Sequence, residues 1–297
     1  MKNIFKQKII DTHHHLWNLS KNKYDWIKDI NNNNFNSNYL LENFLSDVEP
    51  LNLIKTVHIQ AEINTQYELY ETEWIQKISD NNNCLPNGII GHVDFLDDEV
   101  ELKIEKHLLS KNFRGIRQIL KYDNNNKSIS HTSIDYLNND NWIKNLSLLQ
   151  KNDLIFEMLI IYSQYLSAYD VISKYPNILF ILNHSLWPIG INSSNFSRWT
   201  KAVDLLSSLE NVIVKLSGFG ELNANWSKEK IKPFILYSID KFGSNRCMFG
   251  SNFPVDKYVS QSKYLSFWEA YFDIVSDFSE DEIDRIFYKN AEKFYKI

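Results

Sequence analysis

Short apolar runs alternate with longer amphipathic segments along most of the chain. The apolar runs are rich in β-branched residues and continuous rather than alternating, which is typical of parallel strands buried on both faces. We predict eight strands, at Lys8–Asp11, Ile54–Gln60, Gly88–Val93, Arg114–Leu120, Leu154–Leu159, Ile178–Leu182, Val212–Leu216 and Arg246–Gly250.

The segments between these runs have the period of helices, most clearly at Gln66–Ser79, Glu99–Leu109, Leu166–Lys174 and Lys228–Phe242. Farther on, Ser279 and Glu282 have the spacing of a capping box at the start of a last helix. Eight strand–helix units without a compositional break predict one (β/α)8 TIM barrel as a single domain over residues 1–297. A doubly wound sheet is the alternative, but no glycine-rich turn supports it.

Composition narrows the class of protein. The 297 residues are 43% hydrophobic, enough for a large core, and the net charge of -5 argues against a nucleic-acid partner. No apolar run is long enough to cross a membrane, and the N-terminus lacks a secretory signal, so we expect a cytoplasmic protein. Cys84 and Cys247 lack metal-binding spacing and are expected to be two buried thiols in a reducing compartment. The oligomeric state is not indicated.

Polar and ionisable residues occur at or just after the predicted strand ends, where TIM-barrel active sites lie. In strand order they are His13, His14 and His15; His58, Gln60 and Glu62; His92 and Asp94; Arg117 and Gln118; Glu157; His184; Lys215 and Ser217; and Ser251 and Asn252. Packing alone does not explain eight such ends, and we therefore predict a functional site at this mouth of the barrel.

The histidine triplet has a predicted orientation. Side chains alternate along a strand, so His13 and His15 face one way and His14 the other. The first two could share a metal ion or flank a substrate oxygen, and a pair of satisfied core histidines is the alternative. Asp11 lies on their face one layer deeper, where it could accept a ring N–H. Tyr24 and Trp26, which follow, could form aromatic walls of a pocket.

Six stretches together resemble the motif series of the amidohydrolase superfamily: "DTHHHLW", "VHIQAE", "FRGIRQIL", "ILNHSLWP", "VKLSG" and "MFGSNFPVD". The resemblance is greatest to the amidohydrolase-related branch that includes sugar-acid lactonases and 2-pyrone-4,6-dicarboxylate lactonase. It covers nearly the whole chain. It implies a distorted barrel that hydrolyses a lactone bearing carboxylate or hydroxyl groups.

The resemblance assigns His13 and His15 to the HxH pair of strand one, and His184 to the histidine of strand six. It assigns Arg117 to an arginine that binds anionic substrate groups. Asn252 stands where many relatives have a catalytic aspartate, and an amide is no base at neutral pH. Strand five has no lysine to bridge two metals. One divalent ion held by the three histidines, zinc first, and metal-free catalysis both remain open.

With asparagine at position 252, another group must take the proton of the attacking water. Glu62 is one candidate, and His184 is a second because its ordinary pKa is near neutral. We expect Asp256 to be an exposed acid at a helix start. Lys215, in strand seven, is expected to bind an anionic part of the substrate together with Arg117. Gln60 is a further substrate-binding candidate, and Arg114 is expected to pair with a carboxylate outside the barrel.

Three functions therefore stand as hypotheses. The first is hydrolytic ring opening of a sugar-acid or related lactone. The second is a metal-dependent decarboxylase of an unsaturated or aromatic acid, which uses a similar barrel and the same histidines. The third is a non-catalytic sugar-acid binding protein, suggested by the missing aspartate. Ring opening, release of carbon dioxide, and binding without turnover distinguish them.

Overall fold

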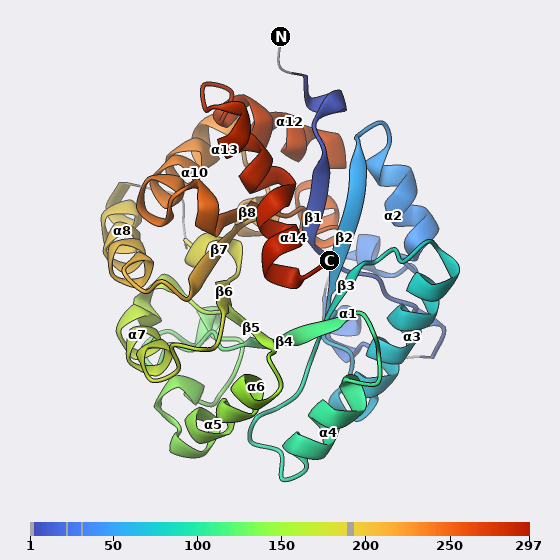
Figure 1. The fold of residues 1–297 in the computed structure, drawn as a ribbon, viewed down its shortest axis with the longest axis vertical. Coiled ribbons are helices and arrows are strands. Elements are labelled where there is room, and N and C mark those ends of the chain that lie inside the picture. Colours follow the sequence, from blue (N-terminus) through green and yellow to red (C-terminus); the bar gives the residue numbers. More distant parts are fainter. Residues whose placement is uncertain (1–2, 22, 31, 189–192) are drawn as a thin grey trace.

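Eight parallel strands form one sheet in sequence order, with helices around it (Figure 1). The computed structural model describes residues 3–21, 23–30, 32–188 and 193–297. The strands are β1 Ile9–His14, β2 Leu53–Ile59, β3 Gly88–Gly91, β4 Phe113–Ile119, β5 Ile155–Leu159, β6 Phe180–Leu182, β7 Val212–Leu216 and β8 Cys247–Phe249. The predicted (β/α)8 barrel is confirmed.

The helices lie outside the sheet, except at the C-terminal end of the described chain. They are α1 Asp25–Asp29, α2 Leu41–Val48, α3 Glu68–Asn81, α4 Val100–His107, α5 Asp140–Asn145, α6 Ser147–Lys151, α7 Tyr165–Ser173, α8 Ser193–Ser207, α9 Phe219–Leu222, α10 Lys228–Phe242, α11 Val255–Ser260, α12 Tyr264–Ile274, α13 Glu280–Asp284 and α14 Asn290–Tyr295. The predicted capping box of Ser279 and Glu282 begins α13. No helix in the described ranges is both long and apolar enough to cross a membrane.

The sheet closes where β1 meets the segment that follows β8. The Asn252 N–H donates to the His13 carbonyl at 2.7 Å, and the His15 N–H donates to the Phe253 carbonyl at 2.7 Å. The Thr12 hydroxyl donates to the Phe249 carbonyl at 2.8 Å. These bonds extend β1 to His14, three residues beyond the predicted end at Asp11. They also place the end of β1 beside the segment that follows β8, so the first and last strands are neighbours.

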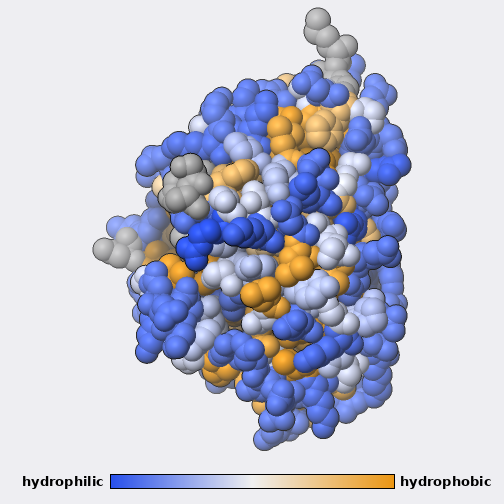
Figure 2. All heavy atoms as spheres, turned by 90° about the vertical axis from the view of Figure 1, so that its left-hand side faces the viewer, coloured by the Kyte–Doolittle hydropathy of each residue, from blue (hydrophilic) through white to orange (hydrophobic). Residues whose placement is uncertain are grey.

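Two apolar layers hold the barrel. The inner layer is built from one or two side chains of most strands and two from α14: Ile10, Val57, Ile59, Ile90, Ile155, Ile181, Ile213, Met248, Ala291 and Tyr295. Figure 1 shows α14 crossing the centre of the barrel, where it covers one mouth. The outer layer packs the helices onto the strands. The face with α7, α8 and α10 is mostly hydrophilic, with hydrophobic residues in small groups (Figure 2).

The side chain of Asp11 departs from the prediction. The register between β1 and β2 shifts between Asp11 and His14, so Asp11 is out of step with the alternation of the three histidines that follow. The carboxylate accepts from Ser251 Oγ at 2.6 Å and from the Tyr264 hydroxyl at 2.9 Å. It therefore ties β1 to the end of β8 and to α12, instead of accepting a ring N–H from His13 or His15.

Candidate active site

A cavity of about 310 Å³ lies at the C-terminal ends of the strands. Its polar lining comes from six strand ends and the loops beyond them: His15, Asn32, Glu62, Arg117, Lys121, His131, His184, Glu221 and Asn252. Aromatic and aliphatic side chains complete the wall, among them Trp17, Trp26 and Phe35. The strand-end pattern of the sequence therefore does correspond to a cavity with convergent polar groups, the usual form of a small-molecule site.

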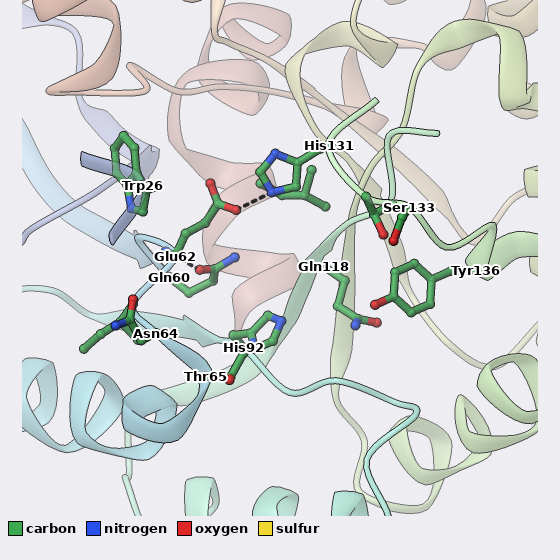
Figure 3. A pocket seen from close by; sticks show the side chains of 13 residues that line it. Trp26, Gln60, Glu62, Asn64, Thr65, His92, Gln118, His131, Ser133 and Tyr136 are labelled. Atoms are coloured by element: carbon green, nitrogen blue, oxygen red, sulfur yellow. Dashed lines mark hydrogen bonds and ion pairs between the residues drawn. The ribbon is translucent and has the colours of Figure 1, made fainter. Parts of the chain in front are cut away.

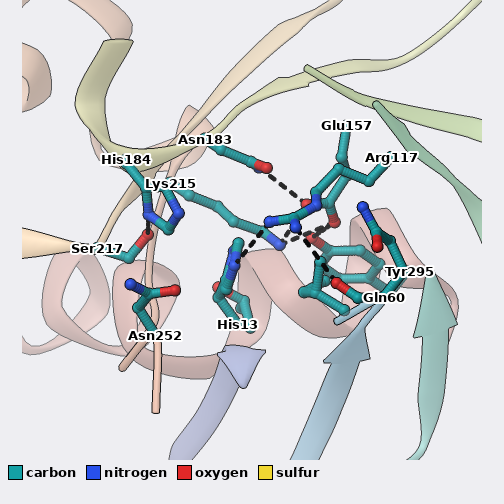
Figure 4. Close-up of polar contacts among 12 residues, drawn as sticks. His13, Gln60, Arg117, Glu157, Asn183, His184, Lys215, Ser217, Asn252 and Tyr295 are labelled. Carbon is teal, nitrogen blue, oxygen red and sulfur yellow. Dashed lines mark hydrogen bonds and ion pairs between the residues drawn. The ribbon is translucent and has the colours of Figure 1, made fainter. Parts of the chain in front are cut away.

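Two histidines of the lining, His15 and His184, meet His13 of β1 beneath the cavity. Figure 4 shows His13 and His184. The ring centroids of His13 and His184 are 4.5 Å apart, and those of His13 and His15 are 5.0 Å apart. All three are buried. His14 points the other way, as the alternation predicts, and stacks on Phe44 at 4.2 Å. The structure thus brings together the three histidines named from the sequence and separates His14 from them.

These histidines are neutral at neutral pH. Burial, together with the charge of neighbouring groups, holds the pKa of His13 and of His184 well below the ordinary value. Burial and then the Arg117 charge lower the pKa of His15 to about 3. His15 Nδ1 lies 2.8 Å from the Ile59 carbonyl, which requires an N–H there and leaves a lone pair on Nε2.

His184 is held in an unusual loop. His184, Ser185, Leu186 and Trp187 all have positive φ, at 51°, 52°, 64° and 46°. Each non-glycine residue in this region costs roughly 1–2 kcal/mol. The buried Trp199 indole donates to the Ser185 carbonyl at 2.7 Å and so supports the loop. Backbone strain of this kind, concentrated at one strand end, fixes the direction of the His184 imidazole.

The neighbouring strand leaves room for that ring. His184 Nδ1 lies 2.9 Å from Ser217 Oγ, beyond the end of β7. Gly218 follows with φ at 72°, and a Cβ there would lie 2.5 Å from His184 Nδ1. The glycine of "VKLSG" is therefore required by both its backbone conformation and the closeness of the imidazole.

Arg117 from β4 reaches the histidines. Its Nη1 lies 3.4 Å from His13 Nε2, and its Nη2 donates to the Gln60 carbonyl at 3.2 Å (Figure 4). Its Nε has no hydrogen-bond partner among the residues that the structure describes. Burial lowers the Arg117 pKa from its ordinary value, but an arginine stays charged in proteins. A buried, incompletely satisfied guanidinium in the cavity wall suits an anionic or carbonyl oxygen.

Lys121 is a second cation of the wall that the sequence analysis missed. Burial lowers its pKa, and its ammonium lies 3.9 Å from the centroid of the Trp187 ring. Trp187 belongs to the strained loop after β6, so the loop positions this cation as well as His184. A lysine two residues past the end of β4 was the signal available in the sequence.

Lys215 lies below the cavity instead of lining it. Its ammonium is 2.7 and 2.8 Å from the two oxygens of Glu157, and both side chains are fully buried (Figure 4). The Tyr295 hydroxyl and the Asn183 amide also donate to that carboxylate, at 2.7 and 2.8 Å. Burial lowers the Lys215 pKa to about 8, although Glu157 acts to raise it. The expected anion is therefore a protein carboxylate.

Asn252 joins His15 to two acids. Its Oδ1 lies 3.3 Å from His15 Nε2, while its Nδ2 donates to Glu221 Oε2 and to Asp256 Oδ1, both at 2.8 Å. Glu221, from the short α9, lines the cavity and was not named from the sequence. The two carboxylate acceptors on Nδ2 fix how the Asn252 amide is oriented at the cavity.

Asp256 corrects the expectation of an exposed acid. It is fully buried in α11 and accepts from the Gly220 and Glu221 N–H groups at 2.8 and 3.0 Å. Burial outweighs these donors and raises its pKa to about 8, with the Glu221 charge adding to the shift. The segment after β8 folds back across the barrel seam, and this burial is not visible in the local sequence.

Glu62 and His131 form an ion pair at the rim. Their oxygen and nitrogen lie 2.6 Å apart, and both residues line the cavity. Burial raises the Glu62 pKa, but the hydrogen bond and charge of His131 outweigh it and leave the pKa below its ordinary value.

Trp26 lines the cavity as expected, whereas Tyr24 is buried beside it and lines neither of the two cavities at this mouth. Gln60 lines the outer one of these two cavities. Arg114, expected to pair with a carboxylate, instead donates to the backbone carbonyls of Tyr295, Lys111 and Phe113.

The groups around the three histidines fit a zinc ion poorly. No group of three or more histidine, cysteine or acidic side chains among the described residues is placed to hold an ion. The Arg117 guanidinium faces His13 Nε2, and the Ile59 carbonyl and the Asn252 amide flank the two nitrogens of His15. The Arg117 cation stands where a metal would meet His13, and Asn252 offers an amide in place of a carboxylate; both are unfavourable for zinc.

Comparison with known proteins gives a consistent result over the whole chain. The sequence model of a family described as Amidohydrolase matches residues 10–297. A Sinorhizobium fredii protein named Uncharacterized protein y4mH is 33% identical, over 97% of this chain and 98% of that protein. An L-fucono-1,5-lactonase of Burkholderia ambifaria is 24% identical, over 97% of this chain and 95% of that protein. The structure of a Burkholderia multivorans amidohydrolase with bound zinc has a TM-score of 0.82 at 18% identity, over 97% and 99% of the two chains.

Proposed function

This chain belongs to the amidohydrolase family, and we propose that it opens the ring of a small hydroxylated or carboxylated lactone by hydrolysis. The observation that carries the proposal is the pairing of a buried cation with neutral imidazoles in one cavity. Arg117 and His184 line it together, so a carbonyl oxygen and an attacking water find complementary groups side by side. The relative named as an L-fucono-1,5-lactonase supports a lactone as the substrate class.

The cations stabilise the charge that develops on the carbonyl oxygen. Arg117 and Lys121 both line the cavity; Arg117 is buried and Lys121 is half-buried. When water adds to the lactone carbonyl, its oxygen becomes an alkoxide, and N–H donors in a site shielded from solvent stabilise it more than water would. Arg117 then holds the carboxylate that hydrolysis produces.

His184 moves the proton. Its Nδ1–H donates to Ser217 Oγ in the proposed tautomer, which leaves the Nε2 lone pair for the attacking water. Water oxygen forms a bond to the carbonyl carbon as its proton passes to Nε2. The bond from this carbon to the ring oxygen then breaks, and the ring oxygen takes the proton from the imidazolium. The low pKa of His184 makes the second transfer the easier one.

The remaining residues orient the reactants. His13 receives the Arg117 Nη1–H, which directs the guanidinium, and His15 is held by the Ile59 carbonyl. Asn252 and Glu221 offer an amide and a carboxylate to substrate hydroxyl groups. Glu62 is paired with His131, so it serves recognition at the rim better than proton transfer. Catalysis in this scheme uses no metal, and the zinc of the Burkholderia multivorans protein belongs to that protein.

A panel of aldonolactones, followed by proton release, tests the proposal. We expect turnover of at least one lactone, and a fall in kcat of about 10²–10⁴-fold in His184→Gln. A metal-dependent decarboxylase is disfavoured by the donor arrangement and would release carbon dioxide instead. Tight lactone binding with no proton release from any lactone would replace the proposal with the binding-protein hypothesis.

A further inference from the structure

A second cavity, of about 510 Å³, opens beside the first (Figure 3). The two cavities share four lining residues: Trp26, Glu62, Ile119 and His131. The Glu62–His131 ion pair is therefore a wall of both. A molecule bound at Arg117 and His184 could pass this pair and continue into the outer cavity.

The outer cavity offers many neutral hydrogen-bonding groups. Neutral polar side chains dominate its lining, with Asn64, Thr65, Gln118, Thr132, Ser133 and Tyr136 among them. Its ionisable groups have partners inside the protein: Glu62 pairs with His131, and His92 lies 2.9 Å from Glu68. Such a lining suits a neutral ligand with many hydroxyl groups, because neutral donors and acceptors outnumber the charged groups and those groups already contact partners.

Two aromatic rings stand on opposite sides of this cavity in Figure 3. The Trp26 indole donates to the Ala61 carbonyl at 2.9 Å, which fixes the ring plane. Tyr136 packs against the buried Trp142, with ring centroids 6.0 Å apart. Aromatic side chains supply rigid apolar faces with a polar edge, and the C–H face of a pyranose packs on such a surface. Sugar is the chemistry that uses both the rings and the amides.

The neighbouring amide of Gln60 completes the arrangement. Its oxygen accepts the Glu62 N–H at 2.6 Å, so its nitrogen is the group left for a ligand. Gln60 is nearly fully buried, and its position is fixed by this bond. A donor held in this way in the wall of the outer cavity, two residues before the shared Glu62, suits the oxygen that links two sugar rings.

We propose that the outer cavity is a subsite for a glycosyl unit attached to the lactone, so that the substrate is the size of a disaccharide. The inference rests on the proposed function of the inner cavity. The inner volume of about 310 Å³ receives the lactone ring, and the outer volume of about 510 Å³ receives the neutral sugar. The glycosidic linkage passes the Glu62–His131 pair.

Binding of open-chain acids tests the subsite without requiring turnover. Calorimetry compares gluconate with cellobionate and maltobionate, which carry an added glucosyl unit in β or α linkage. We expect at least one disaccharide acid to bind tenfold or more tightly than gluconate. Equal or weaker binding of both, or no binding of any acid, overturns the proposal.

Variants locate the added affinity. Ser133→Trp fills the outer cavity from an exposed position, and Tyr136→Ala removes one aromatic face. Both should reduce the advantage of the disaccharide acid to within twofold while gluconate binding is unchanged. Ser197→Trp, on the exposed side of α8, is the matched control and should change neither. Equal losses for both acids in Ser133→Trp would place the effect in the inner cavity and overturn the proposal.

Turnover separates this inference from the function on which it rests. Hydrolysis of gluconolactone and cellobionolactone reports on the inner cavity, whereas the binding ratio of the acids reports on the outer one. A clear binding advantage with no hydrolysis of either lactone would overturn the proposed function and leave the sugar subsite standing. Hydrolysis without the advantage would do the reverse.

Discussion

Replacing Lys215 with methionine would leave the Glu157 carboxylate charged and without its cation inside the barrel. The two side chains are fully buried, and the ammonium is within 2.8 Å of both oxygens. The Tyr295 and Asn183 donors remain, but neither carries a positive charge. We therefore expect Lys215→Met to be strongly destabilising, even though methionine fills most of the lysine's volume.

The size of the loss follows from the burial of the pair. Removing one partner of a fully buried ion pair costs about 3–5 kcal/mol, because the other charge stays uncompensated. The unfolding entropy of a chain of 297 residues is roughly 0.6 kcal/mol per degree, so the melting temperature should fall by about 5–8 °C. The double variant Lys215→Met, Glu157→Gln contains neither charge and should recover most of the loss, since neutral replacement of a buried pair is often tolerated.

Calorimetric or circular-dichroism melting of the wild type, both single variants and the double variant measures this coupling. KM for a hydrolysed lactone should stay within twofold in each variant that folds, since Lys215 does not line the cavity. A melting temperature unchanged in Lys215→Met, together with a tenfold rise in KM, would refute the reasoning. That combination would show that the Lys215 ammonium binds the substrate and not Glu157.

Three further outcomes are expected. Burial raises the pKa of Asp256 to about 8, so the folded state binds the proton of this carboxyl more tightly than the unfolded state does. The wild type should therefore lose stability relative to Asp256→Asn as the pH rises from 4 to 8. A stability difference that stays constant in urea unfolding over these pH values would contradict this. Dialysis against a chelator should change kcat less than twofold, and elemental analysis should find no stoichiometric metal; a loss restored by zinc would contradict the donor arrangement. Gly218→Ala should lower kcat at least tenfold by displacing His184 from its place, whereas His14→Phe, behind β1, should retain activity; lactone assays on folded variants decide both.

Periodicity was sufficient for the barrel because its signal is spread over many residues. Continuous β-branched runs and amphipathic segments each recur along the chain, and the closed parallel sheet follows from their order. Strand ends were less predictable. The apolar run at Gly88–Val93 continues past β3, which ends at Gly91, since the backbone beyond it no longer pairs with a neighbour. β1, by contrast, is longer than predicted, because its last residues bond with the segment that follows β8.

The candidate site was predictable where it depends on strand ends and not where it depends on loops. His13, His15, His184 and Arg117 meet because the barrel brings the ends of β1, β4 and β6 together. Glu157 was identified from the sequence as a residue of the fifth strand, but its pairing with Lys215 was not predictable. Which inward-facing side chains meet depends on the register of the strands, and the sequence pattern does not give that register. Contacts made by loops and short helices, such as those of His131, Glu221 and the buried Asp256, depend on backbone turns that have no periodic pattern in the sequence.

The seam of the barrel also has a consequence for how the protein is made. β1 leaves the ribosome first, but its edge is completed only by the Asn252 and Phe253 segment, which emerges more than two hundred residues later. A nascent chain that has released seven strands holds an unpaired edge, open to association with other chains. It also lacks Asn252 and the Tyr295 hydroxyl that binds Glu157. Competence for catalysis is therefore gained in one late step, when the eighth strand docks against the first.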